Sequence, residues 1–216
     1  MAADCYQELF MEKVKVFVSS ILAGISISLG GTIFLSVEDR VVGSLLFAIG
    51  LFCVCTGGLH LYTGKICYAL QNDRDYVFCL PIIWVGNLTG AFLTAAILRF
   101  SRIAGISEKA ASMCETKGND SLLSLFILGI FCNVFIFIAV EGYKTLSDTG
   151  RYLAIIFGVM GFILCGTEHC VADMFYVSIA GAWSGDFLLR ILIITAGNSV
   201  GGIAAASLLL LARKHS

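Results

Sequence analysis

The chain has 216 residues, of which 58% are hydrophobic and only 13% are charged, and its formal net charge is −1. Together with a mean hydropathy of +0.92, this composition lies far from that of an average soluble domain and predicts a single membrane domain over residues 1–216. The small net charge and the lack of a basic stripe argue against binding to nucleic acid.

Five segments contain no Asp, Glu, Lys or Arg and reach the length of about 20 apolar residues that crosses a bilayer as a helix. In chain order they are Val16–Val37, Val41–Gly64, Tyr76–Leu98, Ser121–Val140 and Ile191–Ala212. A sixth candidate, Tyr152–Gly185, is long enough but is interrupted by Glu168, His169 and Asp173. We therefore expect an all-α membrane protein with six transmembrane helices. The connections, including Arg99–Asp120, are expected to be loops too short for a soluble domain. Six buried helices of a soluble protein would need apolar residues on all faces.

An even number of crossings places both termini on the same side of the bilayer. Lys and Arg are slightly more frequent in the segments on that side, so the positive-inside rule favours cytoplasmic termini. We expect a multi-pass protein of the cell membrane.

Two halves of the chain, about residues 16–100 and 121–212, carry matching landmarks. Cys55-Thr56-Gly57-Gly58-Leu59-His60 corresponds to Cys165-Gly166-Thr167-Glu168-His169, and each half later carries Gly-Asn-x-x-Gly, at Gly86–Gly90 and Gly197–Gly201. Small residues at that spacing allow helices to approach closely, and Asn87 and Asn198 are suited to hydrogen-bond across the contact. With three spans in each half, the second copy must be inverted, as in many transporters.

The glycine-rich interruptions predict that helices two and five are broken, with non-helical backbone lining a cavity. Thr63, with glycines on either side, is expected to lie in a break that moves and gates access, because glycine permits backbone geometry that helices exclude. A continuous second helix, in which the glycines serve only close packing, is the alternative.

The stretch Gly166-Thr167-Glu168-His169-Cys170-Val171-Ala172-Asp173-Met174 resembles the G-x-E-H-x-x-A-N-M motif of the formate/nitrite transporters, which include hydrosulfide channels. The paired Gly-Asn segments are similar to that family as well. The resemblance implies a homopentamer of six-helix protomers, each with its own pore and an aquaporin-like outline. In the family, helices two and five are broken, and a central histidine lies between two hydrophobic slits.

By the same resemblance, His169 matches the central histidine, Thr63 a threonine in the mobile loop that breaks helix two, and Lys117 a lysine near the outer vestibule. Asn133 matches an asparagine inside helix four. Four residues fall on positions that form the family's apolar constrictions, namely Phe47, Leu51, Leu61 and Phe162.

Two residues depart from the family pattern and change the charge near the expected pore. Asp173 stands where the family usually has Asn, and His60 replaces an acidic residue. An ionisable group in a membrane segment is costly and therefore a functional candidate. Asp173 is either protonated or paired with Lys65 or a histidine. Glu168, projecting about 100° away from His169 on a helix, is expected to accept hydrogen bonds from the broken-helix backbone or a neighbour. For His60 a purely structural role is an equal alternative.

The chemistry expected of His169 follows from burial. An apolar slit disfavours the imidazolium, whereas an arriving anion favours it. An anion drawn in by Lys117 would lose water, take a proton from His169 directly or through water, and cross as a neutral acid. The alternative is that His169 only holds the helix break by hydrogen bonds. We predict a channel or transporter for small monovalent weak-acid anions (formate, nitrite or hydrosulfide, with a slight preference for hydrosulfide) and expect no enzyme activity, cofactor or metal.

Two other functions fit the sequence less well. An aquaporin-like channel for neutral solutes would carry two Asn-Pro-Ala motifs, but the chain has a single proline, Pro81. A membrane enzyme or receptor using Glu168, His169 and Asp173 would need more ligands facing one another, and the chain has only three histidines and no zinc-site spacing.

Overall fold

The computed structural model describes residues 2–214, with side chains over residues 11–213, and this part of the chain contains helices and no strand. Four helices are long and apolar enough to cross a membrane. They are α1 (Ala2–Ser36), α4 (Arg74–Leu98), α6 (Leu122–Thr145) and α9 (Gly185–Lys214). The shorter helices are α2 (Arg40–Thr56), α3 (Tyr62–Ile66), α5 (Ile106–Asn119), α7 (Asp148–Leu164) and α8 (Cys170–Ala180), with 3-10 turns η1 (Ala69–Gln71) and η2 (Arg102–Gly105).

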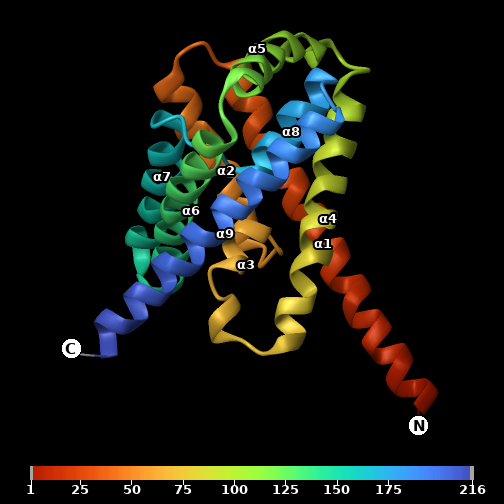
Figure 1. Ribbon diagram of the computed structural model, residues 1–216, viewed down its shortest axis with the longest axis vertical. Coiled ribbons are helices and arrows are strands. Elements are labelled where there is room, and N and C mark those ends of the chain that lie inside the picture. The colour runs from red at the N-terminus through yellow and green to blue at the C-terminus, as the bar shows by residue number, and fades with distance from the viewer. Residues whose placement is uncertain (1, 215–216) are drawn as a thin grey trace.

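The two halves of the chain pack in the same way. In the first half α1 packs against α2 and α4, and in the second half α6 packs against α7 and α9. Contacts of α2 with α7 and of α4 with α8 join the halves. The first turn of α1 and the last turn of α9 lie at one end of the molecule, and α5 lies across the other end (Figure 1).

The Gly-Asn-x-x-Gly segments form close helix contacts, as their spacing predicts. A Cβ on Gly90 of α4 would meet the carbonyl oxygen of Ile21 in α1, and a Cβ on Gly201 of α9 would meet that of Ile130 in α6. Backbone therefore contacts backbone in both pairs, which only glycine allows at these positions.

The glycine-rich interruptions end α2 and α7 with the same backbone motif. Gly58 and Gly166 adopt left-handed conformations, with φ of 61° and 68°. Each of these glycines, and the residue after it, donates its N–H to a carbonyl of the last helical turn, which is the Schellman arrangement. The chain then runs without helix until Tyr62 begins α3 and Cys170 begins α8. The two halves thus place an extended segment at equivalent points.

The segment Arg99–Asp120 is not the loop that we expected. It contains η2 and the helix α5, which packs against α8. The buried residues of α5 are Ile106, Ala110, Cys114 and Lys117. Their spacing of three and four residues places them on one helical face, although most of the segment is polar.

Candidate functional site

Two cavities enter the molecule from its opposite ends. The larger, of about 520 Å³, is lined by the start of α2, by α5 and by α8, and His169 and Phe162 form part of its wall. The smaller, of about 180 Å³, is lined by the end of α2, by α3 and by the end of α6, and Leu61 belongs to its wall. His169 and Leu61 are 2% and 1% exposed, so that buried side chains separate the two cavities.

His169 is held at both ring nitrogens. It is the N-cap of α8, where Nδ1 accepts a hydrogen bond from the backbone N–H of Ala172 at 3.1 Å. Because Nδ1 acts as an acceptor, the proton of the neutral ring lies on Nε2. Nε2 lies 3.0 Å from the hydroxyl oxygen of Thr63 in α3, so the N–H donates to that oxygen. The two short helices meet through this hydrogen bond.

Apolar side chains surround the imidazole. The ring of Phe162 stacks on that of His169 with 5.5 Å between centroids and an interplanar angle of 24°. Phe47 meets Phe162 edge-on at 5.8 Å. Leu51 and Leu61 are each 1% exposed. The stacked Phe162 ring thus covers one face of the imidazole, while His169 still lines the larger cavity.

Asn87 and Asn198 hold the two extended segments in equivalent ways. Asn87 of α4 accepts from the N–H of Tyr62 at 2.8 Å and donates to the carbonyl of His60 at 2.9 Å. Asn198 of α9 accepts from the N–H of Cys170 at 2.9 Å and donates to the carbonyl of Glu168 at 2.8 Å. Each amide also donates to a backbone carbonyl of a neighbouring long helix. Asn87 donates to Ser20 in α1, and Asn198 donates to Gly129 in α6. Backbone groups of the two extended segments are thereby paired.

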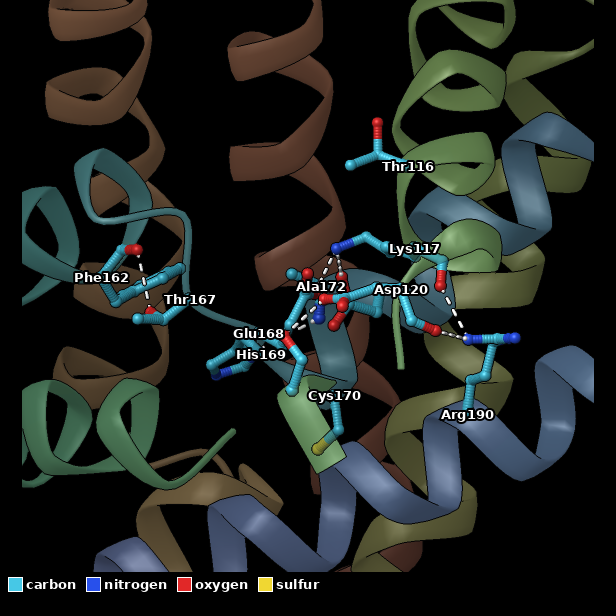
Figure 2. A network of polar contacts seen from close by, with 12 residues as sticks. Thr116, Lys117, Asp120, Phe162, Thr167, Glu168, His169, Cys170, Ala172 and Arg190 are labelled. Carbon is cyan, nitrogen blue, oxygen red and sulfur yellow. Dashed lines mark hydrogen bonds and ion pairs between the residues drawn. The ribbon is translucent and has the colours of Figure 1, made fainter. Parts of the chain in front are cut away.

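A charged cluster lies in the wall of the larger cavity (Figure 2). Lys117 reaches from α5 to the carboxylate of Glu168, and its Nζ lies 3.0 Å from Oδ1 of Asp173. These three residues are 9%, 7% and 2% exposed. The second carboxyl oxygen of Asp173, Oδ2, is buried and has no hydrogen-bond partner among the described residues. One ammonium group therefore faces two carboxyl groups.

Arginines fix the ends of the helices around this cavity. Arg190 of α9 donates from Nη1 to the carbonyls of Lys117 and Asp120, at 2.9 and 2.8 Å, and so holds the end of α5 (Figure 2). Arg40 donates to the carbonyl of Ile163 near the end of α7 at 2.8 Å. Cations at the carbonyl ends of helices are favourable, because those groups lack intrahelical partners.

Two lysines supply the charge in the mostly apolar wall of the smaller cavity. Lys65 of α3 and Lys144 of α6 line it together, and within the described part of the chain its wall contains no carboxylate. The nearby carboxylate of Glu141 accepts from the hydroxyl of Tyr68 at 2.9 Å and pairs with Arg213 at 2.8 Å. Lys144 also lies over the ring of Tyr68, 3.5 Å from its centroid. The smaller cavity is therefore cationic.

The structure brings together most of the residues that the sequence singled out. Lys117, Glu168, His169, Asp173 and Phe162 line one cavity. Thr63 contacts His169, and Asn133 donates to the carbonyl of Thr63 at 3.1 Å.

Three expectations need correction or reassignment. Thr63 lies inside the short helix α3, so its expected place in non-helical backbone is wrong, and only the segment before α3 is non-helical. Asp173 pairs with Lys117, so the expected pairing with Lys65 or a histidine is wrong. His60 lines neither cavity, and its carbonyl and N–H bond to Asn87 and Ser19. Sequence reasoning missed Arg190 and Lys144, which carry no motif of their own.

Comparison with known proteins places this geometry in a family. A family model described as formate/nitrite transporter matches residues 1–212, almost the whole chain. The chain belongs to the formate/nitrite transporter family. Its similarity to formate channel FocB of Escherichia coli is 26% identity, covering 78% of this chain and 67% of that protein. Similarity to the nitrite transporter NirC of Salmonella typhimurium is 27%, covering 87% and 78%. These formate/nitrite transporters are channels or transporters rather than enzymes, and the apolar helices agree with a membrane protein.

Solved structures show the same fold. A structure titled pentameric formate channel with formate bound superposes with a TM-score of 0.80 at 22% identity, covering 95% of this chain and 99% of that chain. A second, titled FNT family ion channel, gives a TM-score of 0.81 at 24% identity, covering 93% and 90%. The arrangement of nine helices over the described residues is therefore that of formate/nitrite transporter channels.

Proposed function

We propose that this protein is a membrane pore for small monovalent weak-acid anions and that the solute passes His169 between two apolar constrictions. Formate, nitrite and hydrosulfide are the candidate solutes, with a preference for hydrosulfide. The observation that carries the proposal is the position of His169, buried between two cavities that approach it from opposite ends of the molecule. Relatives named formate channel and nitrite transporter support this solute class.

The proposed path runs from the larger cavity past Phe162 and Phe47, along His169 and Thr63, and past Leu51 and Leu61 into the smaller cavity. In this proposal α2 with α3, and α7 with α8, each form one broken crossing, which gives six spans in two inverted halves. The matched helix ends and the matched Asn87 and Asn198 contacts support the pairing of the halves. Both termini are assigned to the cytoplasm by the distribution of Lys and Arg.

An ion is expensive in the apolar part of this path, so the solute crosses there as a neutral acid. His169 presents one N–H, shared with Thr63, and its other nitrogen is occupied by the N–H of Ala172. Such a neutral ring offers a hydrogen bond to a small solute that displaces the Thr63 hydroxyl. It is too weak an acid to give up its last proton, so the proton on the solute arrives through water or from another acid. Movement of the segment that carries Thr63 provides the gate.

We further propose that five copies assemble, each with its own pore. The support is the pentameric assembly named for the similar formate channel and the exposed apolar side chains of the long helices, such as Phe92, Phe131 and Leu208, which lipid or a neighbouring copy would cover. Native mass spectrometry in detergent tests this assembly, and a stable monomer or tetramer would contradict it.

The experiment that tests the function is uptake into proteoliposomes, comparing formate, nitrite, hydrosulfide and chloride across a range of pH. We expect uptake of the weak-acid anions, rising as the external pH falls, and exclusion of chloride, which has no neutral form under these conditions. His169→Asn should alter selectivity or pH dependence and leave the oligomer intact. Equal passage of chloride, or unaltered selectivity and pH response in His169→Asn, would refute the role of the histidine.

A further inference from the structure

Asp173 is the least explained ionisable group of the larger cavity. It is 2% exposed, its Oδ1 contacts Lys117, and its Oδ2 has no hydrogen-bond partner in the part of the chain that the structure describes. The same side chain lines the cavity of about 520 Å³ that leads to His169. A buried carboxylate oxygen without a partner is costly, whereas a carboxylic acid in this place carries no net charge and has a proton to donate.

The charges around Asp173 favour that neutral form. Lys117 supplies one positive charge, and Glu168 already contacts the same ammonium group. When two carboxyl groups share one site, their mutual repulsion favours a proton on one of them. Asp173 is the more buried of the two, at 2% against 7% exposed, and its Oδ2 has no hydrogen-bond partner among the described residues, which leaves Asp173 as the group that holds the proton.

The other neighbours of Asp173 do not change its preference for the protonated form. The other titratable side chains near Asp173 are uncharged at neutral pH, namely Cys114, Cys132, Cys170 and Tyr176. From α1, α3, α4 and α9, which also pack against α8, no described charged side chain forms an ion pair with Asp173. Lys117 and Glu168 are thus the charged partners that decide its protonation.

We propose that Asp173 is the proton donor of the larger cavity, delivering its Oδ2 proton to the weak-acid anion before the solute reaches His169. In this step the O–H bond of Asp173 breaks, its electron pair remains on the carboxylate, and a lone pair of the anion forms the new bond to hydrogen. Nothing is oxidised or reduced. Lys117, 3.0 Å from Oδ1, stabilises the carboxylate that forms, and a proton from the cavity water restores the acid.

This inference rests on the proposed function and narrows its substrate class. Proton transfer from Asp173 is easiest to the anion whose conjugate acid is the weakest. Hydrosulfide is the strongest base of the three candidates, because hydrogen sulfide is a weaker acid than formic acid or nitrous acid. The assignment therefore favours hydrosulfide among the three solutes.

Asp173→Asn tests the proposal, because the amide keeps the size of the side chain and an oxygen for Lys117 but has no acidic proton. We expect hydrosulfide uptake at neutral pH to fall by about tenfold or more. This is less than the roughly 10²–10⁴-fold that a positioned proton donor typically contributes, because water replaces part of the proton supply. Formate uptake should fall less. Asp173→Glu keeps the acid and should retain most of the uptake.

Infrared spectroscopy of the protein in lipid gives a second measurement that needs no transport. The wild-type protein should show the carbonyl band of a protonated carboxylic acid. Labelling the side-chain carboxyl groups of aspartate with carbon-13 should shift this band, labelling those of glutamate should not, and Asp173→Asn should remove it. A shift on glutamate labelling, or persistence of the band in Asp173→Asn, would overturn the assignment. So would Asp173→Asn with wild-type hydrosulfide uptake and pH profile. If the wild-type protein carries no weak-acid anion at all, the proposed function itself is refuted, and the infrared band alone decides whether Asp173 holds a proton.

Discussion

The hydrogen bond between Thr63 and His169 is the contact on which the central site depends most directly. The Thr63 side chain is fully buried, and its hydroxyl oxygen lies 3.0 Å from Nε2 of His169. Thr63→Val keeps the shape and removes the acceptor, which leaves a buried imidazole N–H unpaired at a cost of about 1–3 kcal/mol. If His169 stays in place, the free energy of unfolding should fall by about 1–3 kcal/mol. If His169 reorients instead, weak-acid uptake should change roughly tenfold, because about 1.4 kcal/mol corresponds to a factor of ten.

The assay combines uptake into proteoliposomes with unfolding of the detergent-solubilised protein. Thr94→Val is the matched control, because Thr94 is also buried but its hydroxyl donates only to the carbonyl of Gly90 in its own helix, at 2.8 Å. The control should transport as the wild type does. If Thr63→Val matches Thr94→Val in both uptake and stability, the hydrogen bond does not position His169, and the argument from its two occupied nitrogens is wrong.

Two further predictions concern the scaffold and the smaller cavity. Asn198→Leu removes three hydrogen bonds that hold the segment before α8 and should lower the free energy of unfolding by about 3 kcal/mol or more. Asn87→Leu should do the same for α3, and a wild-type midpoint of thermal unfolding in either variant would contradict this role. Lys65→Gln removes one of two ammonium groups from the smaller cavity and should slow anion entry from that end severalfold at low ionic strength, as for charge-steered association. High salt should abolish the difference, and a salt-independent effect would exclude electrostatic attraction.

The interruptions of the apolar runs could be predicted from the sequence because polar and charged groups inside a membrane-length segment are costly in lipid. Glycines, a histidine and carboxylates inside membrane-length segments have few explanations other than a helix break or a site. The Gly-Asn-x-x-Gly spacing likewise predicted two close helix contacts, since Gly90 and Gly201 leave no space for a side chain.

The helix α5 and the partner of Asp173 could not be predicted in the same way. Lys117 and Asp173 are far apart in the chain, and which cation reaches Asp173 depends on how α5 packs on α8. The segment carrying α5 is polar on most of its faces, so composition indicated a loop. In the sequence, only the four-residue spacing of Ile106, Ala110 and Cys114 indicates the buried face of α5. Three residues are too few to predict a helix in a polar segment.

The two halves of the molecule share a scaffold but differ in chemistry at equivalent positions. Counted from the start of each short helix, the N-cap is Leu61 before α3 and His169 before α8, and the fourth residue is Lys65 in α3 and Asp173 in α8. One half thus contributes an apolar barrier and a cation facing the smaller cavity, and the other a polar ring and an acid facing the larger one. Because the backbone contacts of Asn87 and Asn198 are equivalent, these side chains rather than the fold make the two entrances electrostatically different. On the proposed path, a solute that enters as an anion at the cationic end meets an apolar barrier first, whereas one that enters at the other end first meets Asp173, the proposed proton donor.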